Sequence, residues 1–457
     1  MKKIFALAIL FCMVFAVLTS CGSANNDDDK NLGGNTEYKD LEEAHFIFAT
    51  GWTNEFYPDE GKTDSGDNIR LRYADAEEKF NCIFEVLQFT EGEASSYLRN
   101  AIAINDGVPD MMDTHATNAY PVYKEGWLIS LEEISTIDET DFMWGPTKFR
   151  QYGNWDGASY GFFPYNWDFI PQYAGTIMFN NELILQNGMK NPYEMQEQKQ
   201  WTWANFRDEL IAGTIKTAEM NQVGLGIDGV PNYLKAFILA NGGSIVEKSN
   251  DRYVFGLESA NAAMAFDFCK ELKQLKVITE NAAKIDFAVN KKYVYYSTES
   301  WNATINVEKT DNSIDDLPTR VMNDWGLINV PDGPNATGKV TAGFVHMGRR
   351  LNWLIGMSDN DHDDFGLLLN YIFSPIGGKP EAWKEIALKQ FFLDERAYNN
   401  FLYTVENCNY DYSAELYNVR TNVESALTSG YSKGVTGVQA QAARIQTEID
   451  EKMNAVG

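Results

Sequence analysis

The sequence has few cysteines and few histidines, and this scarcity excludes several classes of protein. Five cysteines and four histidines are spread over 457 residues, and no CxxC pair occurs. Cys82, Cys269 and Cys408 lie far apart, so they form neither a disulfide framework nor, with the histidines, a structural zinc site. We expect no metal and no cofactor, and whether individual cysteines pair is left open.

Basic charge is also scarce. The chain carries 38 basic against 65 acidic residues, a formal net charge of −27, and no basic block offsets it. Such a surface repels nucleic acid and anionic lipid, so no nucleic-acid partner is expected. The length exceeds what one hydrophobic core usually fills, which predicts two or more lobes.

No apolar run is long enough for a spanning helix. Lys2 and Lys3 precede an apolar stretch from Ile4 to Leu18, shorter than the ~20 residues that a bilayer requires. This is the pattern of an export signal, predicted over 1–20. The stretch ends in LTSCG, which resembles the bacterial lipobox, and Cys21 is the residue that would be lipidated. The polar, acidic segment 21–43 is predicted to be a flexible tether.

The remaining sequence alternates between strand and helix patterns. Residues 46–49 form a short strand-like run, and 83–87 follow a helical segment with the same character. Residues 94–107 have helical spacing and end at a glycine, and the strand-like VPDMM comes next. This β-α-β-α-β order predicts a mainly parallel sheet covered by helices. The middle of the chain repeats it, and its end is helical.

Three short motifs suggest chemistry, but their surroundings do not support it. GASYG (Gly157–Gly161) matches a hydrolase nucleophile turn, yet Pro164 prevents the helix that should follow. DNDHDDFG (Asp359–Gly366) lacks the glycine and glutamate of a calcium loop and is expected to precede a helix. GPNATGKV (Gly333–Val340) approaches a Walker A motif, but Val340 replaces the hydroxyl residue and a strand-like segment follows, so we expect a hairpin loop.

Six segments, in order along the chain, resemble a known family. They are AINDGVPDMMD, YKEGWLISLEE, DGASYGFFPYNW with GTIMFNNELILQNGM, KQWTWANFRDEL, YYSTESWNATI and WGLINVPDGPNATGKVTAG. Together they resemble the family 1 solute-binding lipoproteins of bacterial ABC importers, which include the maltodextrin-binding proteins. Ser300 departs from the family pattern, where glycine or proline is usual, and the 160–170 segment is longer than usual.

The resemblance implies an α/β fold of two lobes joined by crossover strands, with a ligand cleft between them. The first lobe would comprise 44–165 and 326–378 and the second 166–325, with C-terminal helices over 379–457 packing on the second. It further implies a monomeric, non-enzymatic protein on the outer face of the bacterial cytoplasmic membrane. Its partners would be a carbohydrate, the transmembrane subunits of an ABC permease, and the membrane through its lipid anchor.

Aromatic and polar side chains together suit a sugar, because rings stack on the apolar sugar face while carboxylates and amides bind its hydroxyls. The chain has 11 Trp, 23 Tyr and 27 Phe. Several candidates follow predicted strands, where open α/β sheets bind ligands. Trp301 matches the stacking tryptophan of the family, and Gly343 occupies a position where backbone would approach the ligand. The predicted ligand-binding residues are Trp52, Asp113, His115, Asn118, Trp167, Asp168, Trp301, Gly343 and Tyr412.

Two alternatives stay open at this level. An exported glycoside hydrolase would use two carboxylates across a cleft, and counting acidic residues does not exclude it. A helical-repeat lipoprotein that captures sugars is disfavoured by the strand content and by the lack of a repeat. The identity and length of the sugar are not encoded in any pattern described here.

Overall fold

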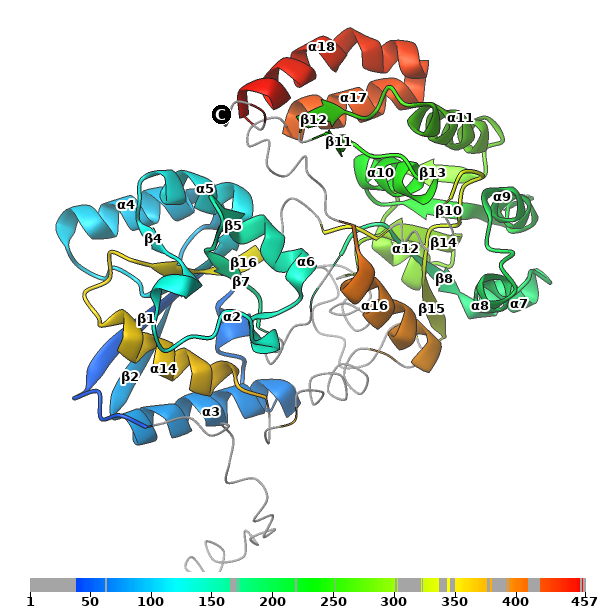
Figure 1. The fold of residues 1–457 in the computed structure, drawn as a ribbon. Helices are drawn as coiled ribbons and strands as arrows, with labels where there is room; N and C mark the ends of the chain where they lie inside the picture. Colours follow the sequence, from blue (N-terminus) through cyan, green and yellow to red (C-terminus); the bar gives the residue numbers. More distant parts are fainter. Residues whose placement is uncertain are drawn as a thin grey trace, which may run out of the picture.

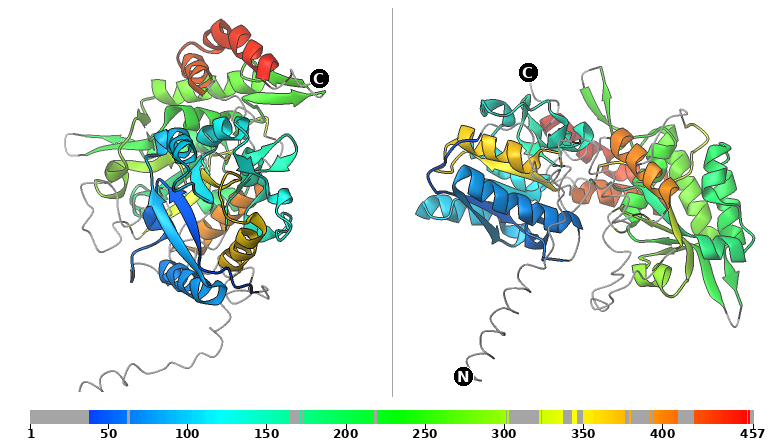
Figure 2. Two further views of the ribbon diagram at one scale, coloured as in Figure 1. Left: turned by 90° about the vertical axis from the view of Figure 1, so that its left-hand side faces the viewer. Right: turned by 90° about the horizontal axis from the view of Figure 1, so that it is seen from below.

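The structure of the protein is a computed structural model. It describes residues 38–61, 64–164, 171, 173–217, 220–250, 252–300, 302, 322, 324–336, 343–345, 350–375, 379, 392, 394–409, 420–452 and 454. These residues form two α/β lobes that lie side by side (Figures 1 and 2). Each lobe is built on its own sheet, as the β-α-β pattern predicts.

The first lobe contains a mixed sheet in the order β2-β1-β3-β16-β4, with β7 also paired to β16. Strands β1, β2 and β3 are parallel, and β16 runs antiparallel to β3, β4 and β7. The strands are β1 (Ala44–Thr50), β2 (Cys82–Gln88), β3 (Met111–His115), β4 (Leu128–Ile129), β7 (Gly161–Phe162) and β16 (Arg350–Ile355). A short hairpin of β5 (Asn154–Trp155) and β6 (Ala158–Ser159) lies beside them.

Alternating side chains of this sheet face two helical layers. Phe46, Phe48 and Met111 belong to the large core, whereas Ala49 and Met112 belong to a smaller cluster on the opposite face. The helices of this lobe are α2 (Thr53–Phe56), α3 (Asp64–Phe80), α4 (Ala94–Ile104), α5 (Ala116–Lys124), α6 (Thr147–Arg150) and α14 (His362–Phe373). Helices α3 and α14 contact each other, as do α4 and α5. Both faces of the sheet are therefore covered.

The second lobe contains a sheet in the order β13-β10-β14-β8-β15, with β9 paired to β10. Its strands are β8 (Thr176–Asn180), β9 (Ile215–Lys216), β10 (Asn221–Ile227), β13 (Ile278–Glu280), β14 (Tyr293–Thr298) and β15 (Trp325–Asn329), and β11 (Val246–Ser249) and β12 (Arg252–Phe255) form a separate hairpin. Because β15 pairs with β8, the chain leaves this sheet after Asn329, a few residues beyond the predicted boundary at 326.

Helices complete the second lobe. They are α7 (Asn181–Gln186), α8 (Pro192–Glu197), α9 (Trp203–Ala212), α10 (Val230–Ala240), α11 (Ala260–Gln274), α12 (Lys284–Ala288), α16 (Glu395–Asn407), α17 (Arg420–Lys433) and α18 (Val435–Lys452). Helix α16 contacts β15, α17 contacts α10 and α11, and α18 contacts β12. The C-terminal helices thus lie against elements of the second lobe (Figure 1).

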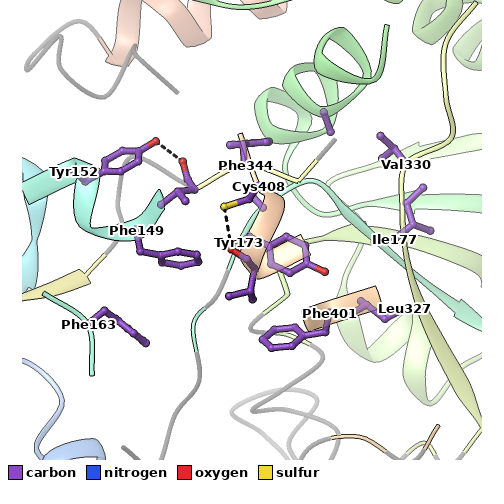
Figure 3. Packing of buried hydrophobic residues seen from close by; sticks show 14 of the residues in the cluster. Phe149, Tyr152, Phe163, Tyr173, Ile177, Leu327, Val330, Phe344, Phe401 and Cys408 are labelled. Carbon is purple, nitrogen blue, oxygen red and sulfur yellow. Dashed lines mark hydrogen bonds between the residues drawn. The ribbon is translucent and has the colours of Figure 1, made fainter. Parts of the chain in front are cut away.

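The segments that connect the lobes pair with one another, and we call this pairing the hinge. Phe344, between β15 and β16, forms bridges to Ala174, just before β8, and to Asn409, just after α16. The Tyr152 hydroxyl of the first lobe donates to the Val345 carbonyl. Figure 3 shows Phe149 and Phe163 of the first lobe on one side of Phe344 and Ile177 and Leu327 of the second sheet on the other. The core is therefore continuous through the hinge.

The three suggestive motifs have structural roles. Ser159 lies in the β5–β6 hairpin, with no helix after it, so the pattern is not a nucleophile turn. Asp361 caps α14 by accepting from the backbone N–H groups of Asp363 and Asp364, as expected for a loop that precedes a helix. Gly333 donates to the Ala240 carbonyl and packs on Asn241, at the end of α10.

The hairpin expected around Gly333–Val340 lies partly outside the described residues, which stop at Ala336 and resume at Gly343. The described part of the segment that follows does not return along β15. Instead Phe344 is bridged on one side by Ala174 and on the other by Asn409. Both edges of this short extended piece are occupied by distant parts of the chain, whose position local sequence does not reveal.

Candidate functional site

The first lobe has a point where the chain changes direction at the carboxyl ends of its strands. From β1 the chain crosses to β2 on one side, and β3 then lies on the other side of β1. Ligands in open α/β sheets bind at such points, because the loops there diverge. Trp52 lies two residues after the end of β1, and His115 ends β3. Their rings lie 5.6 Å apart between centroids, and both side chains are half-buried.

Arg350 lies beneath Trp52. Its guanidinium carbon is 3.6 Å from the centroid of the Trp52 ring, and its Nε donates to Asp113 at 3.0 Å. Further nitrogens of the same group donate to Asp113 and to Glu55. Burial alone would lower the pKa of Arg350, but the two carboxylates raise it above its usual value, so the group stays charged. The result is a buried cation that covers one face of the tryptophan.

Asp113 is nearly inaccessible, at 2% exposure. Besides Arg350 it accepts a hydrogen bond of 3.1 Å from the Thr50 hydroxyl, and that hydroxyl accepts one of 3.0 Å from the Trp52 backbone N–H. The predicted ligand residue is therefore placed under the surface, where its carboxylate binds the protein itself.

His115 and Asn118 both contact Glu91, which precedes α4. One oxygen of Glu91 accepts from the Asn118 amide at 2.7 Å, from Thr114 Oγ1 at 2.7 Å and from the His115 backbone at 2.9 Å, and it lies 3.2 Å from His115 Nδ1. The other oxygen, Oε2, is buried and has no hydrogen-bond partner in the part of the chain that the structure describes. Burial raises the pKa of Glu91, although these donors oppose the shift. A depression of about 740 Å³ adjoins this carboxylate and includes Tyr97 and Asn100.

The second lobe has an equivalent point between β10 and β14. Asp228 follows β10 and accepts from Thr298 Oγ1, at the end of β14, at 3.0 Å. Glu299 follows β14 and accepts a hydrogen bond of 2.9 Å from the Asn232 amide. Asp228 is exposed and Glu299 is half-buried, so this edge presents hydrogen-bonding oxygens next to the hinge. Figure 1 shows α10 and α12 on the side of the second lobe nearer the first, as α2 is in the first lobe.

Ser300, the residue that departs from the family pattern, belongs to the hinge. Its hydroxyl accepts from the Tyr173 backbone N–H at 2.8 Å, and its own N–H donates to the Tyr173 carbonyl at 2.9 Å. Gly343 is buried in the hinge as well. A Cβ at this glycine would lie 2.3 Å from Thr404 Cγ2, so its close approach is to α16.

Four predicted ligand residues lie outside the described residues: Trp167, Asp168, Trp301 and Tyr412. The same holds for Cys21 and the predicted export signal. Cys82, Cys269 and Cys408 are buried free thiols. Among the described residues no cluster of metal-ligating side chains occurs, and no described helix is long and apolar enough to cross a bilayer.

Comparison with solved structures identifies the architecture. The cyclic α-maltosyl-1,6-maltose binding protein from Arthrobacter globiformis matches 90% of this chain and 100% of its own, with a TM-score of 0.65 and 12% sequence identity. The sugar-binding protein MalE from Xanthomonas citri matches 89% of this chain and 98% of its own, with a TM-score of 0.61 and 14% identity. The chain has the two-lobed periplasmic-binding-protein fold. The fold class expected from the sequence is confirmed.

A third match widens the range of ligands seen with this periplasmic-binding-protein fold. A solute-binding protein from Thermotoga lettingae, bound with α-D-tagatose, covers 89% of this chain with its whole length, at a TM-score of 0.57 and 15% identity. All three neighbours are named as binding proteins. No family model matches the sequence, and no curated protein matches it.

Sequence reasoning missed several residues that this fold brings together. Arg350 begins a largely apolar strand, RLNWLI, and an arginine in that position needs a buried acidic partner, which is a usable signal. Glu91, Asp228 and Glu299 follow strands, as the predicted residues do, but many other acidic residues also occupy loops. Only the strand order places these three at the points where the loops diverge.

Proposed function

We propose that this protein is a lipid-anchored, extracellular solute-binding protein that captures a carbohydrate between its lobes and delivers it to an ABC permease. The observation that carries the proposal is the half-buried Trp52 ring beside His115 and Glu91, at the point where the strands of the first lobe diverge. A tryptophan face stacks on the C–H face of a sugar, and carboxylates accept from its hydroxyls. The structural neighbours include a maltose/maltodextrin-binding domain from Bdellovibrio bacteriovorus bound to maltotriose and the Thermotoga lettingae protein bound with α-D-tagatose.

In this proposal each lobe contributes half of the site. Trp52, His115 and Glu91 come from the first lobe, and Asp228, Asn232 and Glu299 from the second. Trp301, Trp167 and Asp168 stay proposed ligand contacts on the resemblance, and Tyr412 stays one as an aromatic residue near the C-terminus. Asp113, Asn118 and Gly343 would act by shaping the site, because their described contacts are within the protein.

Binding would proceed by closure without any chemical step. Rotation about the hinge would bring the two halves onto the ligand, and the ligand would stabilise the closed state by its additional contacts there. Delivery requires a membrane anchor on this reading, which we assign to Cys21. If the full chain is expressed in bacteria and Cys21 carries no lipid label, the assignment of the anchor to Cys21 is wrong.

A thermal-shift screen against a panel of mono- and oligosaccharides tests the proposal. A sugar that binds the folded state at about 100 times its Kd should add about 2.7 kcal/mol of stability and raise the Tm by several degrees. The same incubations are analysed for cleavage products. Turnover of any oligosaccharide would favour a glycoside hydrolase, and a panel without any Tm shift would contradict carbohydrate binding.

Substitution of the proposed stacking tryptophan is a second test. Trp301→Ala should weaken sugar binding by about 1–3 kcal/mol, because the stacked face and its buried area are lost. Calorimetric titration of wild type and variant measures the difference. Trp325→Phe, in a buried strand of the second sheet, serves as the control for loss of an indole elsewhere. Unchanged affinity in a folded Trp301→Ala protein would show that the family motif does not transfer.

A further inference from the structure

The backbone and the ring of Trp52 are both linked to one buried carboxylate, that of Asp113, each through one intervening side chain. Its backbone N–H donates to Thr50 Oγ1 at 3.0 Å, and Thr50 Oγ1 donates to Asp113 at 3.1 Å. On the other side Asp113 accepts from Arg350, whose guanidinium lies 3.6 Å from the centre of the Trp52 ring. These contacts form a closed circuit of Thr50, Asp113, Arg350 and Trp52.

The side chains of this circuit are held in place by burial and by a further contact. Asp113 is 2% exposed and the Arg350 side chain 10% exposed, and Glu55 accepts from a second side of the guanidinium. A paired, hydrogen-bonded charge in such surroundings keeps its geometry, because separating the ions would leave a buried charge without compensation. A guanidinium over an aromatic face adds attraction that grows when the pair is desolvated. One face of Trp52 is therefore held by a rigid group.

We infer that Arg350 is a positioning residue that fixes the Trp52 ring in advance, so that the ring binds sugar without losing side-chain freedom at that moment. The inference rests on the proposed function and extends it to a residue that contacts the ring rather than the ligand. A half-buried tryptophan without such support would have to be ordered on binding. Support beforehand removes that cost, which corresponds to about 2- to 10-fold in affinity for one large side chain.

The test is a double-mutant cycle on sugar affinity. Arg350→Met is made together with Asp113→Asn, so that no unpaired carboxylate is buried, and Glu55→Gln provides a milder loosening that leaves Asp113 paired. Both should raise the Kd by about 2- to 10-fold in the wild-type background. In a Trp52→Ala background the same changes should have no further effect, since the group they position is absent. Arg396→Met, which removes a guanidinium 4.7 Å from the Tyr193 ring in the second lobe, is the matched control.

A measurement without sugar separates this inference from the proposed function. In protein labelled with 5-fluorotryptophan, the Trp52 resonance is assigned by its loss in Trp52→Phe. It should be a single sharp ¹⁹F line in wild type and should broaden or split in Arg350→Met/Asp113→Asn. An unchanged line, or an equal loss of affinity with and without Trp52, would overturn the positioning role even if sugar binds. Absence of sugar binding by wild type, with a line that broadens as expected, would overturn the proposed function and confine the role of Arg350 to ordering Trp52.

Discussion

The segments of the hinge pack closely around Gly343 because this residue has no side chain. The backbone there lies against Thr404 of α16, and Asn409 donates its backbone N–H to the Gly343 carbonyl at 2.8 Å. Asn329, at the end of β15, donates to Thr404 Oγ1 at 2.7 Å. Three distant parts of the chain therefore meet at a position where only glycine avoids a clash.

Gly343→Ala should destabilise the protein by about 1–3 kcal/mol, because its Cβ would overlap Thr404 Cγ2 and force the packed segments apart. Denaturant unfolding measures the change. Thr404→Ser removes the opposing methyl group and keeps the hydroxyl that Asn329 uses, so the double variant should recover most of the lost stability. If it recovers none, the clash is not the cause.

The buried thiols give a second prediction for individual residues. Burial raises the pKa of Cys82, Cys269 and Cys408 to about 12 each. In a chain that starts after Cys21, none of them should react rapidly with a thiol reagent in the native state, and all three should react after denaturation. Rapid native labelling of any one would contradict its burial.

The same shifts set a pH dependence. Because the native state holds these thiol protons more tightly than the unfolded chain does, their contribution to stability is complete below the usual thiol pKa of 9.0. The free energy of unfolding should fall as the pH rises from there toward about 12. Cys269→Ala should show a shallower decline, and an identical slope would contradict the assignment.

Among the elements, α14 is tied to the sequence by a clear signal. Asp361 is its N-cap, and its carboxylate accepts from two backbone N–H groups of the first turn at 3.0 Å each. Asp361→Ala should cost about 0.5–2 kcal/mol of stability, measured by chemical denaturation. Asp359→Ala, two residues earlier in the same acidic loop, is the control and should have little effect. Equal effects would point to general charge rather than capping.

Helices and strands with strong local patterns were predictable. Residues 94–107 were expected to contain a helix, and α4 ends at Ile104, with Asn105 in a left-handed conformation. Helical spacing alone does not identify the buried face of α4: Leu98 and Ala101 are buried, whereas Ile104, three positions after Ala101, is 70% exposed. Small residues of α4 contribute to the core, and the periodicity of large apolar residues does not identify them.

Helices α11 and α9 show two details that the sequence pattern does not predict. In α11 the apolar residues Met264, Phe268, Leu272 and Leu275 lie at helical spacing, yet only Phe268 and Leu272 are buried, whereas Met264 and Leu275 are exposed. Thr202 is the N-cap of α9, a position that threonine favours, yet its side chain makes no capping hydrogen bond.

The candidate site was less predictable than the elements because its contacts are long-range. The sequence places Trp52 shortly after a predicted strand, and in the structure Trp52 follows β1. Arg350, which supports it, pairs with Asp113 from 237 positions along the chain. No local window contains both partners. The same physical reason applies to Phe344, because its bridge partners Ala174 and Asn409 reach it only in the folded molecule.

At the scale of the whole molecule, the proposed closure should be visible as compaction. Addition of a sugar that binds should reduce the radius of gyration measured by small-angle X-ray scattering, because the lobes approach each other. Trp52→Ala at the same sugar concentration should show less compaction, in proportion to its lower occupancy. A bound sugar that leaves the scattering profile unchanged would contradict closure.

The position of β16 has a consequence for the order in which the lobes can be completed. The whole second sheet, 176–329, lies within the sequence of the first lobe, and β16 arrives only at residue 350. Among the described strands, β4 and β7 pair only with β16, so before β16 is available they have no strand to join. Closing so long a loop is slow. The second lobe can therefore fold from strands that are contiguous in sequence. The first sheet is completed only when β16, its last strand in the sequence, is available.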